Sequence, residues 1–194
     1  MNRALHSLPA SYFDALYAAD PDPWKFRTSD YEAAKYQATL EALPRPHYGS
    51  ALEIGCSIGV LTRMLAGRCA RLLALDGAAR AIAQARRHCA GLAQVELQQR
   101  EIPRQWPRGR FDLILFSEVL YYLGHEDLTR TASLALKSLR PGGEVLLVHW
   151  TGTTDYPLSG DAAVESFMAA AGPGLVTAMQ ARTDRYRLDL LRQG

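Results

Sequence analysis

The stretch from residue 50 to residue 67, "SALEIGCSIGVLTRMLAG", decides the fold of this chain. Residues 51–54 are apolar apart from Glu53 and predict a buried strand, and the residues after Gly59 carry apolar side chains at helical spacing. Gly55 and Gly59 lie in the turn between the two. A strand that enters a helix through such a turn is typical of the first unit of a nucleotide-binding α/β sheet. Several cofactors use turns of this kind, so the turn alone does not identify the ligand.

Strands and helices alternate on the C-terminal side of this stretch. Apolar runs such as "FDLILFS" and "EVLLVHW" are typical of strands that are covered on both faces. Strands separated by helices of this length predict right-handed βαβ units and a parallel sheet. The expected strands are 51–54, 71–75, 94–98, 111–116 and 144–149, and the expected helices are 59–66, 77–90 and 127–139, with a turn at "LRPGG".

Both ends of the chain depart from this alternation. Residues 10–43 predict two aromatic-rich helices interrupted by "DPDPW", the second capped by Ser29 or Asp30. Residues 161–171 predict a helix, and 175–183 and 184–192 predict an antiparallel hairpin on the sheet edge. We therefore expect an N-terminal helical cap over residues 1–47 and an α/β domain over 48–194, Rossmann-like and doubly wound.

Bulk composition excludes several classes of protein. The 194 residues are 48% hydrophobic and 22% charged, which is an ordinary globular balance. A net charge of +2 does not suggest a nucleic-acid or membrane partner. Cys56, Cys69 and Cys89 form no CxxC pair, and no feature requires a metal. Since there is no signal-like or membrane-spanning run, we expect a cytoplasmic protein with reduced thiols.

The glycine turn can be tested against the known cofactors. A dinucleotide needs G-x-G-x-x-G, but the three positions here hold Gly55, Ser57 and Val60. The lysine of a P-loop is also missing. S-adenosylmethionine (SAM) has no phosphate, so it needs close backbone approach at fewer positions, and Glu53 can favour its cationic end. The turn therefore favours SAM over NAD.

Acidic residues after the next two strands support this choice. Asp76 ends the second strand, 23 residues after Glu53, close to the spacing of about 20 at which an acid accepts hydrogen bonds from ribose hydroxyls. Glu101 follows the third strand and can accept from an adenine amino group, while Ile102 can cover the ring. An aspartate in the position of Asp76, taken alone, is more often a helix cap than a ribose ligand. The predicted cofactor-binding residues are Glu53, Gly55, Cys56, Ser57, Gly59, Asp76, Gly77, Glu101, Ile102 and Ser117.

Together these motifs resemble class I SAM-dependent methyltransferases, over roughly residues 48–190. That resemblance implies a seven-stranded sheet, mostly parallel, with an antiparallel C-terminal edge strand. "DPDPW", "EIGCSIG", "SEVLYYL" and "VHWTGTTDYPLSGD" resemble the NodS-type nodulation methyltransferases more narrowly. The NodS group N-methylates the free amine of a de-N-acetylated chitooligosaccharide. Ser57, where the wider family usually has Gly, and Glu101, where Asp is commoner, depart from the pattern.

The acceptor should face the end of the fourth strand, where the chain reads "SEVLYYL". Glu118 is the first candidate to bind an acceptor ammonium and take its proton, although it could instead cap a short helix. His149 at the end of the fifth strand could be a general base or a hydrogen-bonded wall residue. We assign Glu118, His149 and Tyr121 to the catalytic group. Residues assigned to acceptor binding are Trp24, Tyr31, Tyr122, Trp150 and Tyr156.

The resulting hypothesis is a SAM-dependent N-methyltransferase for an amino sugar or oligosaccharide, acting as a monomer or homodimer. O-methylation of a small metabolite is the alternative within the same class. An NAD-dependent oxidoreductase, a non-enzymatic domain of the same fold and an RNA methyltransferase fit the motifs less well. Neither nucleic acid nor a membrane is an expected partner.

Overall fold

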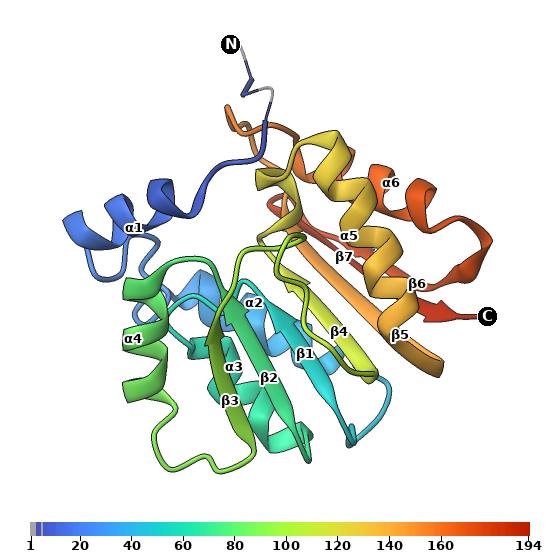
Figure 1. Ribbon diagram of the computed structural model, residues 1–194, viewed down its shortest axis with the longest axis horizontal. Helices are drawn as coiled ribbons and strands as arrows, with labels where there is room; N and C mark the ends of the chain where they lie inside the picture. The colour runs from blue at the N-terminus through green and yellow to red at the C-terminus, as the bar shows by residue number, and fades with distance from the viewer. Residues whose placement is uncertain (1–2, 5) are drawn as a thin grey trace. The chain divides into compact units, whose positions relative to one another are not determined.

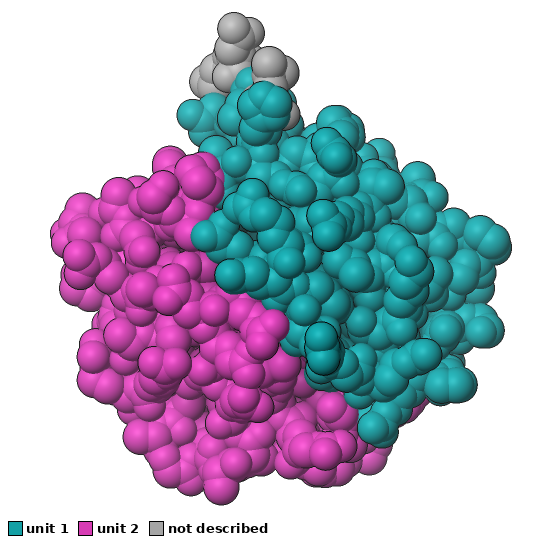
Figure 2. Space-filling model, viewed as in Figure 1, with its two compact units in different colours: residues 1–8, 101–194 teal, residues 9–100 magenta. Residues whose placement is uncertain are grey.

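The computed structural model describes residues 3–4 and 6–194. The chain divides into two compact units, one with the described residues up to Leu8 and residues 101–194 (unit 1), the other with residues 9–100 (unit 2) (Figure 2). The expected boundary near residue 47 therefore falls inside unit 2, so residues 9–47 belong to the same compact unit as the glycine turn. Residues 1, 2 and 5 of the expected cap lie outside the described residues.

Unit 2 holds three parallel strands in the order β3-β2-β1 (Figure 1). Its strands are β1 (Ala51–Ile54), β2 (Leu72–Asp76) and β3 (Val95–Gln99). Its helices are α1 (Ala10–Ala19), α2 (Asp30–Glu41), α3 (Val60–Leu65), η1 (Ala66–Arg68) and α4 (Ala79–His88). The side chain of Ser29 caps α2 by accepting a hydrogen bond from the backbone N–H of Glu32, as predicted for one of the two cap candidates.

Unit 1 holds four strands in the order β4-β5-β7-β6 (Figure 1). Its strands are β4 (Phe111–Ser117), β5 (Leu139–Trp150), β6 (Leu175–Arg182) and β7 (Tyr186–Gln193). Its helices are η2 (Leu120–Tyr122), α5 (His125–Ser138), α6 (Gly160–Ala171) and η3 (Gly172–Gly174). β4 and β5 run parallel, whereas β7 is antiparallel to both β5 and β6.

The predicted fold class, an α/β Rossmann-like seven-stranded sheet that is mostly parallel, is confirmed for the described residues. The C-terminal hairpin is also present, with its turn at residues 183–185. It differs from the expectation in one detail, because the antiparallel strand β7 lies between β5 and β6, and β6 takes the edge. In the part of the chain that the structure describes, no helix has both the length and the apolar character needed to cross a membrane.

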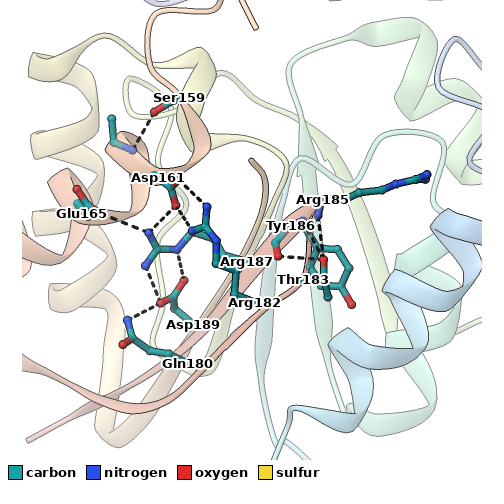
Figure 3. A network of polar contacts seen from close by, with 11 residues as sticks. Ser159, Asp161, Glu165, Gln180, Arg182, Thr183, Arg185, Tyr186, Arg187 and Asp189 are labelled. Carbon is teal, nitrogen blue, oxygen red and sulfur yellow. Dashed lines mark hydrogen bonds and ion pairs between the residues drawn. The ribbon is translucent and has the colours of Figure 1, made fainter. Parts of the chain in front are cut away.

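A network of ion pairs joins the β6–β7 hairpin to the first turn of α6 (Figure 3). Arg187 on β7 makes two hydrogen bonds to the buried carboxylate of Asp189, at 2.9 and 3.0 Å, and a third to Asp161 of α6 at 3.0 Å. Arg182 on β6 binds the same Asp161 at 2.6 Å from a more exposed position. The two bonds from Arg187 compensate the buried carboxylate of Asp189, since a buried charge without a partner is strongly destabilising.

Candidate functional site

The glycine turn of unit 2 is held against the end of β2 by backbone hydrogen bonds. The N–H groups of Gly55 and Cys56 donate to the carbonyl oxygen of Leu75 at 2.8 and 2.9 Å. Gly55, Ser57 and Gly59 all have positive φ, of 79°, 50° and 84°. Positive φ is ordinary for glycine but costs a residue with a side chain about 1–2 kcal/mol. Ser57 is therefore kept in a strained conformation at the centre of the turn.

Gly59 is required by packing as well as by conformation. A Cβ atom there would lie 3.1 Å from Cα of Ala85 on α4 and 3.1 Å from Sγ of Cys89. Gly59 was predicted from the sequence to allow close approach of the cofactor, and the structure adds a packing reason that is independent of any ligand.

Asp76 lies at the end of β2, facing the turn. Its Oδ2 accepts from the backbone N–H of Ser57 at 2.9 Å, and its Oδ1 accepts from that of Ala78 at 2.8 Å. Burial raises the pKa of this carboxyl to about 6, against the lowering effect of these hydrogen bonds. Each carboxylate oxygen has further lone pairs, so the group can also accept from ribose hydroxyls. The residue at the N-cap of α4 is Ala78, so Asp76 is not itself that cap.

Glu53 lies beneath the turn and is 1% exposed. Burial raises its pKa to about 7, Thr62 lowers the pKa, and the charge of Asp76 raises it. Its Oε2 has no hydrogen-bond partner among the described residues. A buried carboxylate in this state is stabilised by a nearby positive charge. The turn thus fits a ligand that carries a cationic group and ribose hydroxyls, as SAM does.

Cys56 and Gly77 contribute to the turn differently. The Cys56 side chain is buried in a cluster with Ala74 and Ile82, and burial raises the pKa of its thiol well above the usual value. Only its main chain is therefore available to a ligand. The carbonyl oxygen of Gly77 accepts from Nε2 of Gln99 at 3.2 Å.

Two of the N-terminal aromatic residues assigned to the acceptor lie in unit 2. The ring of Trp24 stacks on Phe26, with centroids 5.5 Å apart, and packs in a cluster with Tyr17 and Ile58 of the turn. "DPDPW" positions this loop through Asp22, whose carboxylate accepts from the N–H groups that follow it. Tyr31 lies elsewhere, on α2, with the ammonium of Lys35 5.3 Å from its ring centroid.

Tyr17 contacts the glycine turn, although it was not among the predicted site residues. Its hydroxyl lies 2.5 Å from Oγ of Ser57, and the residue is 6% exposed. In the sequence it is one of several aromatic residues on α1, and nothing in that pattern distinguishes it. Its contact with the turn depends on tertiary packing alone.

Four of the remaining candidates lie at the carboxyl ends of β4 and β5 in unit 1. Glu118 follows β4 with φ of 57°, and its Oε2 accepts from the hydroxyl of Tyr121 at 2.6 Å and from the N–H of Trp150 at 2.8 Å. Val119, not Glu118, is the N-cap of η2, so the carboxylate does not serve as a helix cap. Ser117 is the last residue of β4 and is buried.

His149 supports this turn from within the core. The side chain is 0% exposed, and its Nε2 accepts from the N–H of Leu120 at 3.1 Å. A ring nitrogen that accepts carries no proton, so the imidazole is neutral with its proton on Nδ1. The ring also meets that of Tyr121 edge to face, with centroids 5.5 Å apart. This geometry corresponds to a hydrogen-bonded wall residue, one of the two roles considered for His149.

Three tyrosines extend from Glu118 as one aromatic group. Tyr121 and Tyr156 stack with centroids 5.4 Å apart, and Tyr122 meets both edge to face at 4.6 and 4.7 Å. Burial raises the pKa of Tyr121 and Tyr122 well above the ordinary range, so both keep their protons. A Cβ on Gly152 would lie 2.4 Å from the Trp150 indole, which shows that the indole folds back on its own loop.

Glu101 and Ile102 belong to unit 1. The Glu101 side chain is 39% exposed and binds Arg104 at 2.5 Å, and its backbone N–H donates to the side chain of Gln105. Ile102 precedes Pro103 through a cis peptide bond. Their predicted contacts with adenine stay predictions.

Comparison with known proteins identifies the family. The model of the nodulation protein S (NodS) family matches residues 14–149. Nodulation protein S of Rhizobium tropici is 34% identical over 131 residues, 66% of this chain and 55% of that protein. The Bradyrhizobium diazoefficiens protein is 38% identical over 103 residues, 53% of this chain and 49% of that protein. The chain thus spans about half the length of the curated relatives it matches.

A solved structure agrees with the fold. N-methyltransferase NodS from Bradyrhizobium japonicum WM9, in complex with S-adenosylhomocysteine (SAH), superposes with a TM-score of 0.82 at 23% identity, over 96% of this chain and 99% of that chain. The resemblance expected from the motifs is confirmed. This chain belongs to the nodulation protein S (NodS) family.

Proposed function

We propose that this protein transfers a methyl group from SAM to the free amine of an amino sugar, such as a de-N-acetylated chitooligosaccharide. The observation that carries the proposal is the arrangement of Glu118, which keeps a positive φ and whose carboxylate is oriented by Tyr121 and Trp150. Backbone strain of this kind persists where the surrounding structure imposes it, commonly at functional sites. NodS-type relatives supply the acceptor class by resemblance.

Methyl transfer to an amine requires that the protein place SAM and the acceptor correctly and remove a proton from the amine. SAM supplies an activated methyl group when bound, and Glu53, Ser57 and Asp76 are the residues that would hold it. An amine can attack only after it has lost its proton, because the proton occupies the reacting lone pair. Glu118 would bind the ammonium form and accept that proton. Correct placement of two reactants can contribute on the order of 7–11 kcal/mol.

The remaining candidate residues support this function in secondary roles. His149 and Tyr121 would keep Glu118 in place, since one holds the turn and the other donates to the carboxylate. Trp150 and Tyr156 would offer aromatic faces to the sugar rings. Trp24 and Tyr31 would belong to the N-terminal helical cap.

The first experiment measures methyl transfer from labelled SAM to two matched glucosamine oligomers, one with a free terminal amine and one fully N-acetylated. We expect transfer to the free amine alone. Transfer to both oligomers would overturn amine methylation and favour the O-methyl alternative. Transfer to neither, with SAH still bound, would overturn the amino-sugar acceptor.

A substitution tests the role of Glu118 directly. Glu118→Gln keeps the shape of the side chain but removes its charge and basicity, so we expect kcat/KM for the amine acceptor to fall by about 100-fold or more. SAH affinity should not change. The matched control is Glu126→Gln, at an exposed glutamate on α5. Wild-type kcat/KM in Glu118→Gln would contradict the assignment.

A further inference from the structure

We propose that Tyr17 and Ser57 form a hydroxyl pair that donates a hydrogen bond to a ribose oxygen of the bound cofactor. The pair is defined by the 2.5 Å contact between Oη of Tyr17 on α1 and Oγ of Ser57 in the glycine turn. Both residues belong to unit 2. This subsite concerns the cofactor alone and does not depend on the acceptor proposed above.

The pair keeps one donor hydrogen for a ligand. Two hydroxyl groups carry two donor hydrogens, and their mutual bond uses one of them. Neither hydroxyl makes another hydrogen bond within the described part of the chain, so one donor remains available whichever of the two donates. Tyr17 is almost fully buried, and burial together with the charge of Asp76 raises the pKa of its phenol. The phenol therefore stays protonated.

The pair lies beside Asp76. The N–H of Ser57 donates to Oδ2 of Asp76 at 2.9 Å, so the residue that carries one hydroxyl also touches the carboxylate. A ribose offers two hydroxyls, each of which both donates and accepts. The Asp76 carboxylate can only accept while it is ionised, and the pair supplies the missing donor. Together they complement a vicinal diol.

Both members of the pair are held in place by the surrounding structure. Ser57 has φ of 50°, a conformation that would suit glycine better. Tyr17 packs with Ile58, Ala78 and Ala81, which hold its ring in one place. A donor fixed before binding loses little conformational freedom when the ligand arrives. The serine hydroxyl thus gives this strained position a function that glycine could not supply.

The test is the SAH dissociation constant, measured by isothermal titration calorimetry on the full chain. We compare the wild type with Tyr17→Phe, Ser57→Gly and the double variant. Ser57→Gly suits the positive φ, so it removes the hydroxyl without adding strain. Each single change should raise the SAH dissociation constant about fivefold, which corresponds to the loss of one neutral hydrogen bond. The dissociation constant of the double variant should be no higher than that of the single variant that binds more weakly.

The matched control is Tyr12→Phe, at an exposed tyrosine on the same helix, which should bind SAH as the wild type does. SAH analogues that lack the 2′- or the 3′-hydroxyl locate the contact. The analogue that lacks the contacted hydroxyl should bind Tyr17→Phe as tightly as it binds the wild type. Equal loss for SAH and both analogues would overturn the ribose assignment. If the loss of SAH affinity in the double variant equalled the product of the two single losses, the two hydroxyls would not act as a pair. Wild-type affinity in Tyr17→Phe would refute the pair as well.

Because SAH binding needs no acceptor, failure of this inference is distinguishable from failure of the proposed function. Loss of amino-sugar methylation in every assay would leave the calorimetric result unchanged. Thermal unfolding of each variant confirms that the compared proteins are folded.

Discussion

The buried carboxyl of Glu53 makes the stability of this protein depend on pH in an unusual direction. Its pKa is raised from the ordinary 4.5 to about 7 in the folded chain, chiefly by burial. Between these values the folded state binds more protons at Glu53 than the unfolded state does. The free energy of unfolding should therefore fall as the pH rises from about 4.5 to about 7. Most acidic residues have lowered pKa values in folded proteins and act in the opposite sense.

The size of the effect follows from the shift. At about 1.36 kcal/mol for each unit of pKa, Glu53 contributes on the order of 3 kcal/mol that is present at pH 4.5 and lost by pH 7. Glu53→Gln removes the titrating group but keeps its volume. The difference in free energy of unfolding between wild type and variant should therefore change by that amount across the interval. Asp76 titrates in both proteins and contributes to both curves.

Urea unfolding of the ligand-free protein at closely spaced pH values measures this difference. The control is Glu41→Gln, at an exposed glutamate on α2, which should follow the wild-type curve. If the difference between wild type and Glu53→Gln did not change between pH 4.5 and 7, burial of Glu53 would not control its ionisation.

Two further predictions concern packing and charge. Gly59 and Gly91 share φ of 84°, but a Cβ would meet α4 only at Gly59, so Gly59→Ala should lower the free energy of unfolding by roughly 1–3 kcal/mol more than Gly91→Ala. Equal losses in urea unfolding would show that conformation alone explains both glycines. Arg187→Ala leaves the buried Asp189 without its main partner and should cost about 3–5 kcal/mol, whereas Arg182→Ala, at an exposed pair, should cost less than about 1 kcal/mol. Similar losses for the two arginines would refute the importance of burial here.

The order and type of the elements were predictable because the strands are long apolar runs. β4 is buried at every residue except Asp112, and β5 is buried throughout residues 143–149, and their sequences show it without any long-range information. Element ends were predicted less well, by one or two residues in β2, β3 and α4, since hydrogen bonds across the sheet decide where a strand stops. The residues of "LRPGG" were expected to be a turn, yet the structure places them in β5. The ladder with β4 is irregular there, because Phe111 pairs with Leu139 and Leu113 with Glu144, and Gly142 has φ of 68° between the two pairs.

The candidate site was predictable only as a set of positions. Asp76 and Glu118 follow apolar strands, and carboxyl ends of such strands form the binding edge of α/β sheets. The atoms that each side chain touches were not predictable. Cys56 points into the core and His149 is fully buried, although both were predicted as site residues.

The sequence by itself therefore determined the fold class, the family and the acidic positions at the strand ends, because periodic apolar runs and short motifs are local properties. Only the tertiary structure decided that Tyr17 reaches Ser57, that Gly59 is required by α4, and that Glu53 is buried strongly enough to titrate near neutrality. Each of these depends on residues distant in the chain. Distances and burial between such residues arise from packing, which no local pattern of residues encodes.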